Sequence, residues 1–484
     1  MNEEAKSPDL VSHVSGTLCE FCDSIFRGPK IRRNINRPDY ARVESLVDRC
    51  VICAIIFHTA SKAGLPPIQT WPYLEYGWTQ SSAEENTLLL GFWVHKDGRK
   101  ELLGSSMTFF PLNGKPHSAQ AFSDLTEPVE ASTLFNMAYV GSNKQLNDDW
   151  ALIETWMQSC LQNHQACNQP KTPTNWRPTR LLDLDPPELP KGICLREGDE
   201  IPPCTRYTTL SHCWGSAQLI TLTTENKASM KKALSLSAFP KTFRDAIAIT
   251  TRLQVRYLWI DSLCIIQSSR EDWAKESGLI CSVYGNSHCN IAATAASNSS
   301  EGCFTANPRQ TKDARRPFAV HIDWDGWRGA YCASQSGPDI WDELDGAPLS
   351  TRAWVHQERL LAPRVVHFGL SQLAWECNEV RVAELSPPGT SVPARGIREF
   401  SKQGCASMWI RSEARGPLGP REFLQRWGYV WSKYAGLRLT RETDRLVALA
   451  GIVDKIQPVL KDDFLAGLWR RDLEQQLCWW TPVP

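Results

Sequence analysis

The sequence predicts an α/β fold: a mostly parallel sheet flanked by helices, with N-terminal and C-terminal extensions that are mainly helical and carry added β-hairpins. Three observations predict the sheet. Residues 207–214 read as a short strand, residues 239–255 repeat apolar side chains at three- and four-residue steps, and residues 257–266 form an almost continuous apolar run. Strand, amphipathic helix and buried strand make a βαβ unit whose second strand is covered on both faces.

The chain before this unit divides into two parts. Residues 1–170 contain two Cys-x-x-Cys pairs, a hairpin signal at Asp97-Gly98 between apolar runs, and helical apolar spacing over residues 150–168. Residues 171–206 are rich in proline and polar side chains, which predicts an exposed linker.

The α/β domain is expected to span residues 207–380. Its second helix begins at Ser269, with Asp272 three positions later as in a capping box. A small apolar strand over 289–297, paired strands in 318–334 and 364–377, and a helix over 350–361 follow. Residues 381–484 predict a C-terminal helical region. Its ending, "LCWWTPVP", suggests a chain cut from a longer protein.

Composition excludes several classes of partner. Lys plus Arg and Asp plus Glu are both 53, so no net field attracts nucleic acid. No apolar run is long enough to span a bilayer, and the acidic start lacks the pattern of a signal peptide. We therefore expect a cytoplasmic protein whose 17 cysteines are thiols or metal ligands and not disulfides.

The adjacent residues His212 and Cys213 suggest a nucleophile and its base. Successive side chains of a strand point to opposite faces, so these two would face apart and a catalytic pair between them is disfavoured. Cys213 then packs as a small apolar group. His212 and Trp214 stand where the strand ends, which is where open α/β sheets bind ligands, and both are pocket candidates.

Two acidic residues are further pocket candidates. Asp261 interrupts an apolar strand, and it either faces a cleft at the strand end or accepts backbone N–H bonds. Glu276 lies beside the apolar face of the next helix, where a surface position is the alternative.

Trp354 and Glu358 are four positions apart and therefore share a helical face. A carboxyl group beside an aromatic wall is desolvated, which raises its pKa and suits acid–base or charge-stabilising chemistry. Arg352 and Arg359 are close enough in sequence to oppose that shift. The alternative is an ordinary helix in which Glu358 pairs with an arginine.

The two Cys-x-x-Cys pairs are Cys19 with Cys22 and Cys50 with Cys53, the ligand types of a structural zinc site. The separation of the pairs is longer than in common zinc ribbons, and His58 could replace one sulfur. The alternative is that each pair packs on one helical face as small apolar groups.

Several motifs together resemble one family. "YTTLSHCWG", "FPKTFRDAI", "YLWIDSLCIIQ", "DWAKESGLICSVYGNSHCNIAATAASNSSEGCF" and "STRAWVHQERLLAPRVVHFG" occur in the order of the three blocks of the fungal heterokaryon incompatibility (HET) domain. The resemblance runs from about Tyr207 to Glu358. His212 stands where the family often has Tyr, Ile266 where Asn is frequent, and residues 277–280 depart from the commoner helix.

The resemblance implies a TIR-like, flavodoxin-like sheet and a fungal protein of self/non-self recognition and programmed cell death. Some TIR domains cleave NAD with a glutamate in a Trp-Cys-x-x-Glu pattern. Trp354 and Glu358 have that spacing, with Val355 in place of the cysteine, which makes Glu358 the expected catalytic acid and NAD a candidate substrate. This is an analogy between folds.

Two other functions stay open. The chain could be a non-enzymatic module that signals by binding other protein chains, including copies of itself, through its motif tryptophans. It could also be a thiol or zinc enzyme that uses the N-terminal cysteines.

Overall fold

The computed structural model describes two units of the chain, each taken by itself. The first comprises residues 1–144, 308–339 and 385–390, and the second residues 145–307, 340–384 and 391–484. The described residues are 20, 22, 26, 33–35, 50, 52, 53, 74–80, 88–96, 99–111, 145–169, 175–189, 192–215, 220–304, 318–324, 327–335, 340–384, 401–410, 419–471 and 473–478.

The first unit contains a six-stranded antiparallel sheet. Its strands, in spatial order, are β1 (Arg33–Ile35), β2 (Leu74–Gln80), β3 (Leu88–Lys96), β4 (Arg99–Pro111), β11 (Trp327–Gln335) and β10 (Phe318–Trp324). β3 and β4 pair in antiparallel fashion up to Lys96 and Arg99, and the predicted turn residues Asp97 and Gly98 lie outside the described ones. The predicted hairpin over 318–334 is also confirmed.

This unit differs from the expected mainly helical extension, because most of its described residues are in strands. A two-stranded hairpin is marginally stable alone, and here the predicted hairpin is part of a six-stranded sheet. The hairpin β10–β11 pairs with β4 and so joins the first unit, although its residues fall inside the range predicted for the α/β domain.

The second unit contains an eight-stranded mixed sheet. In spatial order its strands are β14 (Arg381–Ala383), β13 (Leu373–Cys377), β12 (Arg364–Phe368), β9 (Cys289–Ala292), β7 (Tyr207–Ser211), β8 (Tyr257–Trp259), β5 (Arg180–Asp183) and β6 (Cys194–Glu197). The four central strands are parallel, and the pairs at both edges are antiparallel. The α/β class and the central sheet predicted from the sequence are confirmed.

The four parallel strands follow a definite order. Numbered along the chain from β7, they lie as second, first, third and fourth across the sheet. The chain therefore leaves β7 toward one side to reach β8, then returns past β7 to form β9 on the other side. This reversal leaves the carboxyl ends of β7 and β9 side by side without a helical connection directly between them.

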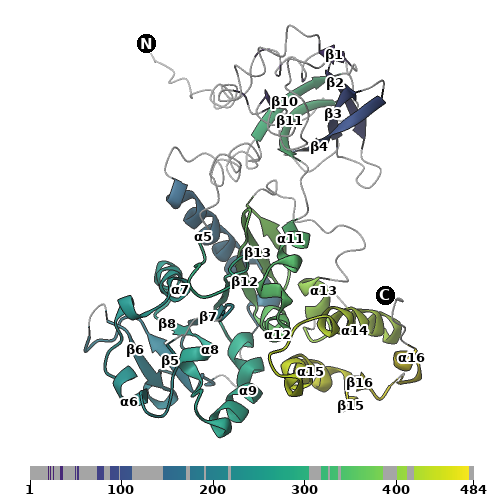
Figure 1. The fold of residues 1–484 in the computed structure, drawn as a ribbon. Coiled ribbons are helices and arrows are strands. Elements are labelled where there is room, and N and C mark those ends of the chain that lie inside the picture. Colours follow the sequence, from purple (N-terminus) through teal and green to yellow (C-terminus); the bar gives the residue numbers. More distant parts are fainter. Residues whose placement is uncertain are drawn as a thin grey trace, which may run out of the picture. The chain divides into compact units, whose positions relative to one another are not determined.

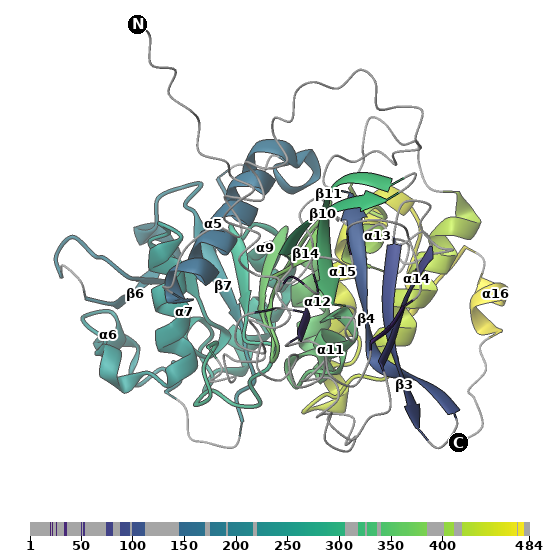
Figure 2. The same cartoon turned by 90° about the horizontal axis from the view of Figure 1, so that it is seen from above.

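Helices cover both faces of this sheet (Figures 1 and 2). On one face lie α5 (Gln145–Asn163) and α7 (Lys241–Arg252), whose apolar residues share a core with Leu210, Leu258 and Ile291 of the strands. On the other face lie α9 (Arg270–Gly285) and α12 (Ala353–Leu361), and α14 (Pro420–Ala435) and α15 (Val447–Leu460) share their core.

The remaining elements are short. The α-helices are α6 (Lys227–Met230), α8 (Asp261–Cys264), α11 (Ile340–Gly346), α13 (Lys402–Ala406) and α16 (Leu473–Leu477). The 3-10 turns are η3 (Gln165–Cys167), η4 (Gly198–Glu200), η5 (Leu236–Ala238), η6 (Leu349–Thr351) and η8 (Glu442–Asp444). A two-stranded hairpin joins β15 (Phe464–Leu465) to β16 (Leu468–Trp469). The described residues from 401 onward are mostly helical. None of the described helices is long and apolar enough to cross a membrane.

Residues 171–206, predicted to be an exposed linker, instead contribute β5 and β6 to the sheet. Two of its charged residues, Arg180 and Asp183, are buried in ion pairs. Asp183 is fully buried and accepts two hydrogen bonds of 2.7 Å from the guanidinium of Arg256. Such a pair is compatible with a strand near the sheet edge, where the guanidinium retains solvent contact.

Candidate functional site

The site begins where β7 and β9 end. Ser211 is the last residue of β7 and Asn290 lies in the neighbouring β9, and both are buried. The Asn290 side chain donates to Ser211 Oγ at 3.0 Å and accepts from Thr209 Oγ1 at 2.9 Å. Ligands of open α/β sheets bind at the carboxyl ends of the strands where the strand order reverses. Ser211 stands at that end of β7, and Asn290, the second residue of β9, bonds to it from within the neighbouring strand.

Glu358 of α12 completes this polar group. Its Oε2 accepts a hydrogen bond from Ser211 Oγ at 2.5 Å, and its side chain is only 8% exposed. Glu358 does not form the ion pair with Arg359 that was the alternative, because Arg359 donates to Glu376 and to Asp345. Glu358 is therefore held by a neutral hydroxyl.

Burial raises the pKa of Glu358 to about 7, against the opposing effects of the Ser211 hydrogen bond and the positive charge of Arg352. Tyr284 of α9 also lies at this carboxyl group, and burial raises the pKa of its hydroxyl well above the usual range. A carboxyl group with a pKa near 7 exchanges protons at neutral pH, as general acids and bases do.

Trp354 has a different partner from the one expected. Its ring packs edge-to-face against Trp273 of α9, with 6.3 Å between ring centroids, and it remains half-buried. The desolvation of Glu358 follows from burial of its carboxyl group among α9, α12 and the strand ends.

A second polar group follows β7 and β8. Trp214 Nε1 donates to Asp261 Oδ2 at 2.9 Å, and His212 Nδ1 lies 3.8 Å from Asp261 Oδ1. Asp261 also accepts from the backbone N–H of Ser262 at 2.7 Å, which is one of the two alternatives expected for this aspartate, and its place at a cleft stays a prediction. Trp214 and Asp261 are partly exposed, whereas His212 is buried.

His212 and Cys213 face apart, as strand geometry predicts. The His212 ring packs against Phe243 of α7 at 5.0 Å, while Cys213 joins the core on the opposite face. Burial lowers the pKa of His212 to about 4, so the ring is neutral at physiological pH. Within the described part of the chain, its buried Nε2 has no hydrogen-bond partner.

Arg352 links the two polar groups. Its guanidinium donates to the backbone carbonyl of His212. Its charge lowers the pKa of both His212 and Glu358, while the charge of Asp261 raises both. His212, Asp261 and Glu358 are therefore electrostatically coupled around one end of the sheet, although Glu358 contacts Ser211 and not His212.

Glu276 belongs to a separate cluster. It is buried, as its place beside the apolar face allowed, and lies 3.7 Å from the guanidinium of Arg180. Arg180 also donates to Asp272 and to the carbonyl of Cys264 at 2.9 Å. No hydrogen bond or ion pair among the described residues joins Glu276 to Glu358, so its pocket role stays a prediction.

The N-terminal cysteines converge in part. The sulfur atoms of Cys22, Cys50 and Cys53 all lie within 4.8 Å of one another, and those of Cys22 and Cys53 are 3.7 Å apart. Three thiols at this spacing can hold one zinc ion. Cys19 and His58, the two candidates for a fourth ligand, lie outside the described residues.

No motif or spacing in the sequence points to Ser211, Asn290 or Tyr284 as a site residue. A signal existed for Asn290, which is the one polar residue of the short apolar strand β9, whereas Ser211 shares β7 with Thr208 and Thr209 and does not stand out. The position of Arg352 in the sequence predicts that it lowers the pKa of Glu358, which it does, but not that it contacts the His212 carbonyl.

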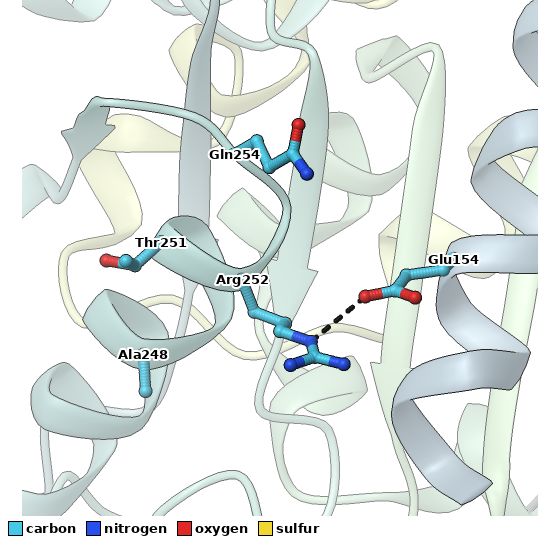
Figure 3. Close-up of a pocket in the computed structure, with 5 residues that line it drawn as sticks. All are labelled: Glu154, Ala248, Thr251, Arg252 and Gln254. Carbon is cyan, nitrogen blue, oxygen red and sulfur yellow. Dashed lines mark hydrogen bonds and ion pairs between the residues drawn. The ribbon is translucent and has the colours of Figure 1, made fainter. Parts of the chain in front are cut away.

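A pocket lies elsewhere on this unit, open to solvent between α5 and α7 (Figure 3). It is lined by Glu154, Ala248, Thr251, Arg252 and Gln254. Glu154 and Arg252 form an exposed ion pair at 2.9 Å. Exposed ion pairs contribute little to the free energy of unfolding. This surface carries none of the predicted site residues.

Comparison with known proteins identifies the central part of the chain. Residues 207–358 match the family model described as heterokaryon incompatibility protein (HET). No curated protein and no solved structure gives a significant match to the chain. The matched range begins at the first residue of β7 and ends at Glu358, so it contains both polar groups described above.

Proposed function

We propose that this protein is an effector of fungal self/non-self recognition and programmed cell death, and that it hydrolyses NAD. The proposal starts from its HET domain, which implies a role related to heterokaryon incompatibility. The carboxyl group of Glu358 is its catalytic group. The observation that supports this best is the burial of the Glu358 carboxyl group over the adjoining ends of β7 and β9.

The strand order supports a nucleotide substrate. The parallel strands follow the order second, first, third, fourth, which matches the first four strands of flavodoxin-like sheets. Such sheets bind nucleotide cofactors at the switch point between the first and third strands. Ser211 and Asn290 stand at the corresponding place here.

The proposed reaction breaks the bond between the nicotinamide nitrogen and ribose C1. The bonding electrons leave with nicotinamide, water adds to C1, and the water loses one proton. Positive charge develops on the ribose as the bond breaks, and the ionised carboxylate of Glu358 stabilises it. Ser211 orients that carboxylate through their hydrogen bond.

The helix that carries Glu358 fits the TIR pattern by spacing. Trp354 and Glu358 lie one helical turn apart on α12, and Val355 replaces the cysteine. His212, Trp214 and Asp261 form the outer wall of the proposed pocket, with Trp214 and Asp261 partly exposed to an incoming ligand. Since Glu358 is 8% exposed, activation must open this region, for which assembly with other chains is the proposed trigger.

The test follows nicotinamide release from NAD by chromatography, using the purified full-length chain under conditions that make it oligomerise. Glu358→Gln should reduce release by roughly 100-fold or more. Glu384→Gln is the matched control, because Glu384 is also buried and accepts a hydrogen bond from the Leu373 N–H at 3.0 Å.

Two outcomes would overturn the enzymatic proposal: no release by the wild-type chain once it has assembled, or full release by Glu358→Gln. Toxicity on expression that survives Glu358→Gln would instead favour a non-enzymatic interaction module.

A further inference from the structure

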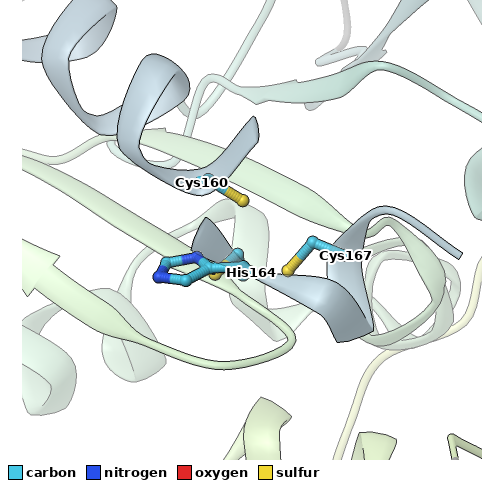
Figure 4. Close-up of side chains that lie close together, drawn as sticks. Cys160, His164 and Cys167 are labelled. Atoms are coloured by element: carbon cyan, nitrogen blue, oxygen red, sulfur yellow. The ribbon is translucent and has the colours of Figure 1, made fainter. Parts of the chain in front are cut away.

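Four metal-ligand side chains converge outside the range matched by the HET family. Cys160, His164, Cys167 and Cys377 place three sulfur atoms and one imidazole nitrogen within 4.8 Å of one another. Cys160 and Cys377 are fully buried, Cys167 is 7% exposed and His164 is half-buried. Figure 4 shows the three that come from the end of α5 and the following turn.

Local structure presents these ligands from one short segment. Cys160 and His164 are four positions apart, and the His164 N–H donates to the Cys160 carbonyl at 3.2 Å, which continues the helical pattern of α5. Both side chains therefore lie on one face. The turn η3 then returns the chain so that Cys167 faces them. Asn168 fixes this turn by donating from its side chain to the His164 carbonyl at 2.8 Å.

The fourth ligand comes from the sheet. Cys377 ends β13, and its Sγ lies 3.3 Å from His164 Nδ1. Two hydrogen bonds connect the turn after Cys377 to Ala166, in the turn that follows α5. The Asn378 side chain donates to the Ala166 carbonyl at 3.1 Å, and the Ala166 N–H donates to the Glu379 carboxylate at 2.7 Å. The four ligand atoms are thus held from both sides.

This donor set matches zinc. Tetrahedral zinc binds sulfur at about 2.3 Å and imidazole nitrogen at about 2.0 Å, which puts ligand atoms roughly 3.7 Å apart. A spread within 4.8 Å allows closure around one ion by small rotations of the side chains. Three thiolates and one histidine fill all four positions, as in structural sites, so no position remains for a substrate.

Two neighbouring groups fit bound thiolates. The Val380 N–H points at Cys377 Sγ from 3.4 Å, and Arg364 Nε lies 3.2 Å from Cys160 Sγ. Zinc with three thiolates and a neutral histidine carries one net negative charge, which the Arg364 guanidinium balances. Arg364 is only 4% exposed, and within the described residues it forms no ion pair with a carboxylate.

The geometry points to a structural zinc site formed by Cys160, His164, Cys167 and Cys377, which fastens α5 to the antiparallel edge of the sheet. All four ligands lie outside residues 207–358. The site is also separate from the N-terminal cysteines, which belong to the other unit. The folded α/β unit therefore requires segments on both sides of the matched range.

The test uses the full-length chain with Cys50→Ser and Cys53→Ser, which removes the N-terminal cluster. We expect one zinc per chain by elemental analysis, and X-ray absorption should show three sulfur ligands and one nitrogen ligand. Adding Cys167→Ser should remove the zinc and lower the unfolding temperature. Adding Cys405→Ser is the matched control, because Cys405 is equally buried but lies in α13, and zinc should stay.

His164→Cys covers the case in which Cys167→Ser does not fold. A fourth thiolate retains the metal, so this variant should keep zinc, and its cobalt(II) form should show more intense sulfur-to-metal absorption than the parent. Absence of zinc from the parent chain, zinc retained by Cys167→Ser, or an unchanged cobalt spectrum in His164→Cys would overturn the assignment. None of these readouts depends on NAD.

Discussion

The hydroxyl of Ser211 donates a hydrogen bond to the carboxylate of Glu358, a residue 147 positions later in the chain. The bond joins the end of the first parallel strand to the helix α12, which follows the third. It favours the ionised form of Glu358 and so opposes the effect of burial on the pKa of that carboxyl group.

Ser211→Ala should therefore raise the pKa of Glu358 above about 7, because burial then acts without this donor. The pH midpoint of nicotinamide release should move upward, since the ionised form is the active one. NMR titration of labelled glutamate measures the same shift without activity. Thr208→Val is the control, because Thr208 bonds Thr250 on the opposite face of β7. Equal midpoints in wild type and Ser211→Ala would contradict the assigned role.

Glu358→Gln should make stability less dependent on pH. The folded protein keeps the Glu358 proton up to about pH 7, whereas the unfolded chain releases it near 4.5. In wild type the free energy of unfolding therefore falls as pH rises from 4.5 through 7. This decrease in the free energy of unfolding amounts to about 3 kcal/mol in the wild type above pH 7, and it should be absent in the variant. Denaturant unfolding at pH 5 and pH 8 checks it, and an equal gap between the proteins at both pH values would refute it.

Gly215→Ala should destabilise the segment that carries His212 and Trp214. Gly215 has a φ of +73°, and an added Cβ would lie 2.4 Å from Asn298 Cβ. Backbone strain at such a position costs roughly 1–3 kcal/mol. Gly346→Ala serves as control, because a Cβ there meets nothing within 4 Å. Urea unfolding should give a lower free energy of unfolding for Gly215→Ala than for Gly346→Ala. An unchanged free energy of unfolding in Gly215→Ala would show that the turn can relax.

Gly451→Ala should also destabilise the protein, although alanine normally favours a helix by about 1 kcal/mol. Gly451 lies where α15 crosses α9 and α12, and an added Cβ would lie 2.7 Å from Gln357 Oε1 and 3.1 Å from Cys281 Cβ. Gly278→Ala in α9 meets nothing within 4 Å and should stabilise. We expect the unfolding temperature to fall in Gly451→Ala and to rise in Gly278→Ala. A rise in both variants would mean that the helix crossing has room for an added methyl group.

We expect a second zinc ion at the N-terminal cysteines Cys22, Cys50 and Cys53. Cys53→Ser should remove one zinc equivalent from the full-length chain, because Cys22, Cys50 and Cys53 form one cluster. Cys19→Ser should have the same effect if Cys19 is the fourth ligand, while His58→Ala should leave the metal content unchanged. Elemental analysis of the three variants decides between the two fourth ligands, and full zinc in Cys53→Ser would dismiss the site.

Local pattern was enough to predict much of the α/β unit. The strand β7, the helix α7 and the strand β8 follow from apolar spacing, and the opposed directions of His212 and Cys213 follow from the two-residue period of a strand. Ser269 accepts from the Asp272 N–H at 3.1 Å, as the cap of α9 requires. These features depend on neighbours within a few positions, so the sequence contains them directly.

Other features depend on how distant segments pack. The sequence by itself determined β7, α7, β8 and the start of α9, and the family resemblance made Glu358 the expected catalytic acid. Only the tertiary structure decided that Glu358 meets Ser211, that 171–206 supplies strands, and that Cys377 joins Cys160. The reason is that sheet order and helix docking bring together residues far apart in the chain, and no local period records which of them will meet.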